Sequence, residues 1–182
     1  MKPFVFVNSL TLSRIFLSVL FYWTVSYFPE QFVYHILIFA IIFLTDFFDG
    51  RLARQYNVET RAGAVFDVIA DLFFVTCSFA VLIRNNILPF WILIVAIVKF
   101  AEFWVSSMVS AKKSKTVAGV FIFDGLGKAA ALLLYALSAV GIMAYVLLPV
   151  NAAAVFVLFY CGLVTLMAAV SSVNRVYLCI KY

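Results

Sequence analysis

The chain has 182 residues, of which 67% are hydrophobic and only 12% charged, and its mean hydropathy is +1.16. A soluble domain of this size does not carry so much apolar surface, because its exterior must face water. The composition therefore predicts an all-α integral membrane protein, and at about 20 residues per span the length allows six or seven transmembrane helices. Three cysteines without C-x-x-C spacing indicate neither a disulfide framework nor a zinc site.

The net charge of +5 does not indicate nucleic-acid binding, because the basic residues are confined to particular segments. Ten of the thirteen Lys and Arg residues fall at the N-terminus, in residues 46–71, in residues 111–116 or at the C-terminus. With an even number of spans, these four segments emerge on one side of the bilayer. The positive-inside rule then places both termini and residues 46–71 in the cytoplasm, in a multi-pass protein of the cell (inner) membrane.

The chain is predicted to form one membrane domain, residues 1–182, with six transmembrane helices. Residues 1–9 are expected to form a short amphipathic segment at the membrane interface. The six spans are expected at about residues 10–28, 32–54, 61–83, 87–110, 117–148 and 152–174. Arg14 lies near the cytoplasmic end of the first span and is able to snorkel towards the interface. His35, the only histidine, is expected near the outer surface.

Residues 46–71 carry four aspartates, at positions 46, 49, 67 and 71, inside otherwise apolar helices. The first pair is spaced i,i+3 and the second i,i+4, so each pair shares one helix face. The second and third spans are antiparallel neighbours, and the two pairs are therefore expected to meet near the cytoplasmic surface. Carboxylates in apolar surroundings need a neutralising charge, and Mg²⁺ and Mn²⁺ prefer carboxylate oxygens. The pattern predicts a site for two such ions, an arrangement suited to phosphoryl displacement.

The residues between the aspartates describe a cleft for a flat or phosphorylated ligand. Gly50 and Ala53 have no side chain or a small one, so a ligand can approach this helix face closely. Gly63 leaves the same space on the facing helix. Arg54 lies at the end of that face and is suited to a phosphate or a nucleobase carbonyl. One aspartate at the edge of the metals could accept a proton from an attacking hydroxyl.

The full pattern D-x-x-D-G-x-x-A-R-x8-G-x-x-x-D-x-x-x-D occurs without a gap, as Asp46, Asp49, Gly50, Ala53, Arg54, Gly63, Asp67 and Asp71. It resembles the signature of the CDP-alcohol phosphatidyltransferase family, and the stretch Asn8–Arg14 is similar to the lead-in of many bacterial members. The resemblance implies a homodimeric enzyme that transfers the phosphatidyl group of CDP-diacylglycerol to a small polar alcohol and releases CMP. It implies that the four aspartates bind two Mg²⁺ or Mn²⁺ ions and that Asp71 is also the general base. The CDP-binding positions that it implies are Gly50, Ala53, Arg54, Gly63, Thr60, Asn8 and Thr11.

The identity of the acceptor alcohol is not contained in this signature. Glycerol 3-phosphate is the first hypothesis, because it is a common bacterial substrate and because basic residues line the cytoplasmic mouth, namely Lys112, Lys113 and Lys115. The same lysines also fit a positive-inside loop. Val68 and Leu72 stand where glycerophosphate-using members often have Pro and Lys, so inositol phosphate, serine or a cardiolipin-type acceptor remains open.

Two pairs of opposite charge inside the spans, Asp124 with Lys128 and Lys99 with Glu102, could face the acceptor or satisfy each other. A purely structural alternative for the four aspartates is helix capping and ion pairing with nearby arginines. A rival function is a cation-coupled transporter, which would place its ion site near the bilayer midplane between internal repeats. This chain shows no repeat, and its acids lie near one surface. A non-catalytic membrane scaffold would instead tolerate neutral residues at the aspartate positions.

Overall fold

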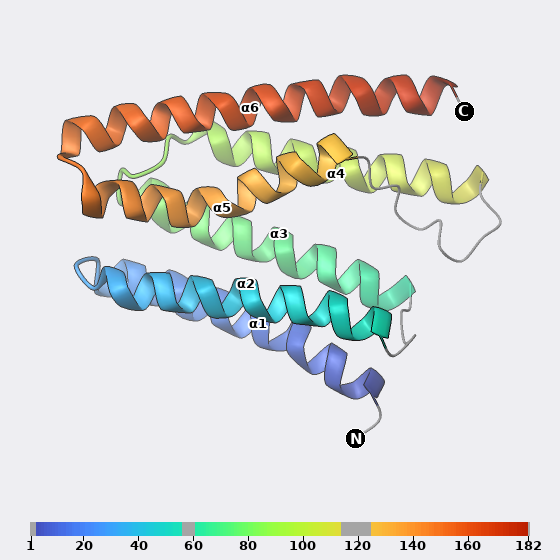
Figure 1. Cartoon of the computed structure of the whole chain (residues 1–182), viewed down its shortest axis with the longest axis horizontal. Coiled ribbons are helices and arrows are strands. Elements are labelled where there is room, and N and C mark those ends of the chain that lie inside the picture. The colour runs from blue at the N-terminus through green and yellow to red at the C-terminus, as the bar shows by residue number, and fades with distance from the viewer. Residues whose placement is uncertain (1–2, 56–60, 114–124, 182) are drawn as a thin grey trace. The chain divides into compact units, whose positions relative to one another are not determined.

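The computed structural model describes residues 3–55, 61–113 and 125–181, with side chains for residues 11–48, 51, 55, 63, 65–105 and 125–175. These residues form six helices and no strand, which confirms the predicted all-α class. The helices are α1 (Pro3–Tyr27), α2 (Phe32–Gln55), α3 (Arg61–Arg84), α4 (Trp91–Lys113), α5 (Gly125–Leu147) and α6 (Val150–Lys181) (Figure 1). Because α1 already begins at Pro3, the described part of the predicted interfacial segment is continuous with the first span.

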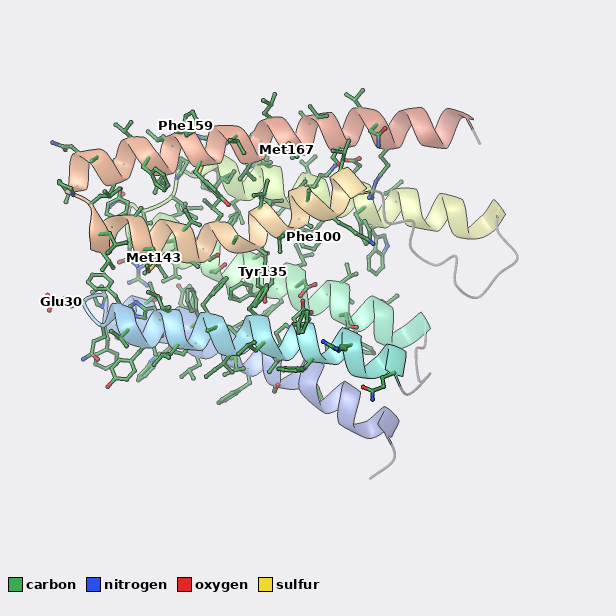
Figure 2. The ribbon with its side chains drawn as sticks, in the orientation of Figure 1. Glu30, Phe100, Tyr135, Met143, Phe159 and Met167 are labelled. Carbon is green, nitrogen blue, oxygen red and sulfur yellow. The ribbon has the colours of Figure 1, made fainter. Side chains whose placement is uncertain are left out.

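The distribution of apolar side chains is that of a membrane protein. Within the described residues, three helical segments are long and apolar enough to cross a bilayer, Val65–Arg84, Gly125–Leu147 and Val150–Arg175, and Phe32–Phe48 is a shorter apolar segment. Carbon-rich side chains cover the helices, and Phe159 of α6 is 71% exposed (Figure 2). On α1 the outward face is apolar while Arg14 and Ser18 are fully buried. Apolar residues outside and polar residues inside indicate a helix that faces lipid, and the chain is a multi-pass membrane protein.

The contacts divide the chain into two compact units, Met1–Asn85 and Asn86–Tyr182. In the first unit α1 packs against both α2 and α3 (Figure 1). The turn between α1 and α2 falls at Pro29 and Glu30, in the interval between the first two predicted spans. There the Phe28 N–H donates to Thr24 O at 2.8 Å and the Gln31 N–H donates to Phe28 O at 3.0 Å, so the helix end is closed by local bonds.

An aromatic cluster joins the three helices of the first unit. Phe21 of α1 and Phe74 of α3 are both 0% exposed, and their ring centroids lie 5.9 Å apart in an edge-to-face arrangement. Phe39 of α2 contacts Phe74 with a centroid distance of 5.9 Å. His35 is 1% exposed and contacts Phe21 edge-on. His35, which was expected near the outer surface, is therefore packed inside the unit.

In the second unit α6 packs against both α5 and α4. The connection from α5 to α6 is short, with the Leu148 N–H donating to Ala144 O and the Ala153 N–H donating to Pro149 O, each at 2.9 Å. This turn lies in the interval between the predicted fifth and sixth spans, at Pro149. The fifth span was expected at about residues 117–148. In the structure α5 begins at Gly125, and residues 117–124 lie outside the described residues.

Close packing of α5 against the start of the second unit depends on Gly141. A Cβ at this position would lie 3.3 Å from Ile87 Cγ2 and 3.7 Å from Leu88 Cδ2. We expect Gly141→Leu to lower the free energy of unfolding by about 1–3 kcal/mol, because the added side chain overpacks this contact. Thermal unfolding in detergent measures the change. Gly162→Leu is the matched control, since a Cβ at Gly162 meets nothing within 4 Å; equal losses in the two variants would contradict the packing argument.

Candidate active site

One face of α1 supplies polar groups to the interior of the first unit. Thr11, Arg14 and Ser18 are spaced i, i+3 and i+7, and they therefore lie along one side of the helix. Thr11 is 6% exposed, and Arg14 and Ser18 are 0% exposed. The Ser18 hydroxyl donates to Arg14 O at 2.7 Å, which satisfies this buried hydroxyl within the helix. The buried guanidinium of Arg14, in contrast, requires partners from other helices.

Three aspartates of the signature provide the partners for this face. Arg14 Nη1 donates to Asp71 Oδ1 at 2.9 Å, and Arg14 Nη2 lies 2.8 Å from Asp46 Oδ1. The Thr11 hydroxyl donates to Asp67 Oδ1 at 2.9 Å. Asp46 comes from the C-terminal half of α2, whereas Asp67 and Asp71 come from the N-terminal half of α3. Asp46, Asp67 and Asp71 are thus brought to one place by α1, which lies against both helices.

The carboxylates lie at the edge of the unit rather than in its centre. The side chains of Asp46 and Asp71 are 41% and 30% exposed, while that of Arg14 is fully buried. A planar guanidinium that contacts two carboxylates makes charge-assisted bonds and fixes their orientation. The result is a small ionic site in which the buried guanidinium of Arg14 contacts partly exposed carboxylates. A ligand can reach the carboxylates from the exposed side.

The donor chemistry of this site suits a hard divalent cation, since carboxylate oxygens are the ligands such ions prefer. Among the described residues, however, no three acidic, His or Cys side chains already stand close enough together to hold a metal. The side chain of Asp49 lies outside the described residues and is not part of this comparison. The Arg14 guanidinium contacts one oxygen each of Asp46 and Asp71, and the carboxylates fit a divalent cation by their chemistry.

The other predicted site residues are placed only in part. Gly63 lies in the first turn of α3 and is partly exposed. The backbones of Asn8, Asp49, Gly50, Ala53 and Arg54 lie in α1 or α2, but their side chains are outside the described residues, as is Thr60 altogether. Of the lysines considered for the acceptor, only Lys99 and Lys128 have described side chains; the side chains of Lys112, Lys113 and Lys115 do not belong to the described set.

Arg14 is the site residue that sequence analysis missed. The sequence indicated only that it is able to snorkel, whereas its side chain is fully buried and ion-paired. Two signals pointed to it: a charge four residues inside the predicted first span, and Thr11 one turn before it on the same face. An intramembrane arginine needs a counter-charge. The aspartates of residues 46–71 were the acidic residues predicted at the same side of the membrane as Arg14.

A second polar cluster joins α4 to α6 in the other unit. Lys99 is 7% exposed, and its Nζ lies 3.1 Å from Glu102 Oε2, 3.3 Å from Ala168 O and 3.1 Å from Ser172 Oγ. Ser172 also bonds Glu102. These contacts confirm the predicted Lys99–Glu102 pair. An ammonium group has three donors, and the three contacts use all of them in this arrangement.

The fold and the site together define a polytopic α-helical membrane protein with a carboxylate site built on its first three helices. The chain belongs to the CDP-alcohol phosphatidyltransferase family, whose model matches residues 4–174. This match covers both units and includes all the aspartates of the signature. The family is generally dependent on divalent cations.

Bacterial relatives share parts of the sequence. The chain is similar to proteins of Rickettsia felis (42% identity over 50 residues, 28% of each chain) and Rickettsia typhi (44% identity over 50 residues, 28% of each chain). A protein of Salmonella choleraesuis is 38% identical over 97 residues, or 51% of each chain. All three are named CDP-diacylglycerol–glycerol-3-phosphate 3-phosphatidyltransferase. The matches thus span about half or less of these relatives' lengths. No solved structure matches the chain.

Proposed function

We propose that this protein is an enzyme of phospholipid biosynthesis that transfers the phosphatidyl group of CDP-diacylglycerol to an alcohol and releases CMP. The observation that carries the proposal is the convergence of Asp46 and Asp71, from two helices, on one buried guanidinium. It brings separate halves of the family signature together at a partly exposed edge. Membership of the CDP-alcohol phosphatidyltransferase family and the names of the relatives support the same reaction.

In this proposal Asp46, Asp49, Asp67 and Asp71 hold two Mg²⁺ or Mn²⁺ ions. The α1 contacts use Oδ1 of three of these carboxylates, and the ions would bind through the remaining carboxylate oxygens. Bound there, divalent cations neutralise the pyrophosphate charge and stabilise the departing CMP.

Asp71 is the proposed general base. Its carboxylate accepts the proton of the acceptor hydroxyl, whose oxygen then attacks the β-phosphorus that carries diacylglycerol. A phosphorus–oxygen bond forms to the acceptor, and the bond from this phosphorus to the CMP oxygen breaks. The 30% exposure of the Asp71 side chain supports access by a polar substrate, while the bond from Arg14 keeps the carboxylate oriented.

The CDP moiety is proposed to lie against the small residues of α2 and α3, with Gly50, Ala53 and Gly63 leaving room and Arg54 contacting phosphate or cytosine. Thr60 and Asn8 are further candidates. Thr11 remains one as well, although its hydroxyl donates to Asp67 in the structure; this contact gives it a second role, that of orienting a metal ligand.

Glycerol 3-phosphate is the proposed acceptor, which would make the product phosphatidylglycerophosphate. The names of the relatives support this choice. Lys112, Lys113, Lys115 and Lys128 are the candidate contacts to its phosphate. Inositol phosphate, serine or a cardiolipin-type acceptor is the alternative, since Val68 and Leu72 differ from the residues expected of glycerophosphate users.

We further propose that residues 1–182 act as one membrane domain and that the protein is a homodimer in the cytoplasmic (inner) membrane with both termini in the cytoplasm. The family match across both units supports the single functional domain. The charge distribution supports the orientation.

The decisive experiment supplies the purified protein with CDP-diacylglycerol, Mg²⁺ or Mn²⁺ and a panel of alcohols, and it measures CMP release. We expect CMP with glycerol 3-phosphate and none after EDTA is added. No CMP with any acceptor would overturn the proposed reaction, and cation-dependent flux into sealed vesicles would then favour a transporter. A phosphate-free alcohol that outperforms glycerol 3-phosphate would overturn only the choice of acceptor.

A further inference from the structure

Arg14 is a fully buried cation placed beneath two of the proposed metal ligands. Its Nη1 donates to Asp71 Oδ1 at 2.9 Å and its Nη2 lies 2.8 Å from Asp46 Oδ1. The two aspartates come from α3 and α2, so one side chain of α1 holds parts of three helices together. The aspartate side chains are 30% and 41% exposed, whereas Arg14 is 0% exposed. The guanidinium therefore meets the carboxylates from the inside, and the opposite side is left for a ligand.

The contacts make the guanidinium and the carboxylates depend on one another when no metal is bound. A buried charge that loses its partner is strongly destabilising, because the interior cannot solvate it. Clustered carboxylates repel one another unless a cation lies between them. Arg14 supplies that cation, and its fork geometry allows it to serve two carboxylates at once, which the single ammonium group of a lysine does less well.

We propose that Arg14 is a positioning residue: it is the resident cation that keeps Asp46 and Asp71 in place before a divalent ion binds, and its charge weakens the binding of that ion. This inference rests on the proposed function, which assigns the metal to the same aspartates. The guanidinium already contacts one oxygen of each carboxylate, and an arriving ion must share these groups with it.

Two opposing effects decide what loss of Arg14 does to metal affinity. Without Arg14, the ion itself has to order two aspartate side chains, which lowers affinity. Loss of the positive charge removes the repulsion between a guanidinium and a doubly charged ion that bind the same carboxylates, which raises affinity. Repulsion at this short range in a partly buried site exceeds the ordering cost of two short side chains. Removal of Arg14 is therefore expected to tighten metal binding.

The test measures Mn²⁺ binding to the full-length protein in detergent, from the electron paramagnetic resonance signal of free Mn²⁺. Arg14→Gln is expected to bind Mn²⁺ at least about tenfold more tightly than the wild type. Arg14→Lys keeps the charge and is expected to stay within about threefold of the wild type. Arg84→Gln removes an exposed arginine from the last turn of α3 and is the charge-matched control, with unchanged affinity expected.

Thermal unfolding provides a readout that does not involve activity. In EDTA, Arg14→Gln and Arg14→Lys are both expected to unfold at a lower temperature than the wild type. Mn²⁺ is expected to raise the midpoint temperature of unfolding of Arg14→Gln more than that of the wild type. An ion that binds the folded state more tightly stabilises it more. A variant that folds only when Mn²⁺ is present supports the inference in the same way.

Unchanged or weaker Mn²⁺ binding by Arg14→Gln would overturn the inference, since a purely structural role predicts weaker binding. If Arg14→Gln folds under no condition, Arg14→Lys decides: wild-type stability in EDTA overturns the inference, and a lower midpoint with near wild-type Mn²⁺ affinity supports it. Absence of Mn²⁺ binding by the wild type would overturn the proposed metal site and this inference with it. A wild type that binds Mn²⁺ and releases CMP, beside an Arg14→Gln variant of equal affinity, would overturn only the role of Arg14.

Discussion

Asp71→Asn is expected to lower the rate of CMP release by about 10³-fold, because general acid–base catalysis by a positioned side chain contributes roughly that much. The amide cannot accept the proton of the acceptor hydroxyl, and it is a poorer metal ligand than a carboxylate. The fold should survive, since Asn Oδ1 can still accept the hydrogen bond that Arg14 Nη1 gives to Asp71 at 2.9 Å. Steady-state CMP release with saturating CDP-diacylglycerol and glycerol 3-phosphate measures the loss.

The control for this variant is Glu30→Gln, which makes the same carboxylate-to-amide change at an exposed turn of the first unit. Its activity should equal that of the wild type, and thermal unfolding of both variants should show that neither loses the fold. If Asp71→Asn retains more than about a tenth of wild-type activity, Asp71 is not the base, given the usual contribution of such a group. The metal site could then still stand on Asp46, Asp49 and Asp67.

The helices and the aspartate cluster could be predicted from the sequence because both depend on local spacing. Apolar runs of about 20 residues predict spans, and the i,i+3 and i,i+4 intervals put each pair of acids on one face. The meeting of Asp46 with Asp71 was expected from direct packing of the second span against the third, whereas in the described residues both helices pack chiefly against α1. The structure adds that this meeting is indirect, since both carboxylates contact Arg14 of α1.

The role of Arg14 could not be predicted because it depends on the rotation of α1 about its own axis. An arginine near the end of a span can snorkel to the interface or turn inward to a counter-charge, and composition does not distinguish the two. Packing decides it, and the exposed apolar face of α1 turns Arg14 inward. The burial of His35 could not be predicted for a related reason, since its place near a helix end does not reveal that Phe21 packs against it.

The residues of the acceptor pocket could not be predicted for a different reason. Lysines that set topology and lysines that bind a phosphorylated acceptor are the same residue type at the same side of the membrane. The sequence therefore could not separate them. For Lys99 the structure shows a set of internal partners, because its Nζ contacts Glu102 on its own helix and Ala168 and Ser172 on α6. These bonds depend on how α4 and α6 are aligned against each other. Packing sets this alignment, and the spacing of residues within one helix does not predict it.

Lys99→Met is expected to lower the free energy of unfolding by about 3 kcal/mol, because removing one member of a buried ion pair leaves the other charge uncompensated. Glu102 would keep its bond to Ser172 but lose its only described ion-pair partner. The value falls at the lower end of the usual range for such changes, since the Glu102 side chain is 21% exposed. Thermal or denaturant-induced unfolding in detergent measures the loss.

The double variant Lys99→Met/Glu102→Gln separates a structural role from a substrate-binding role. It contains no unpaired charge, and its amide can still bond Ser172, so most of the lost stability should return. If Lys99 only ties α4 to α6, CMP release should recover together with stability. A double variant that is stable but has a much higher KM for glycerol 3-phosphate would contradict this expectation and would place Lys99 in the acceptor pocket. Such a result would require the ammonium to leave Ala168 O and Ser172 Oγ when substrate binds, since these bonds occupy its remaining donors.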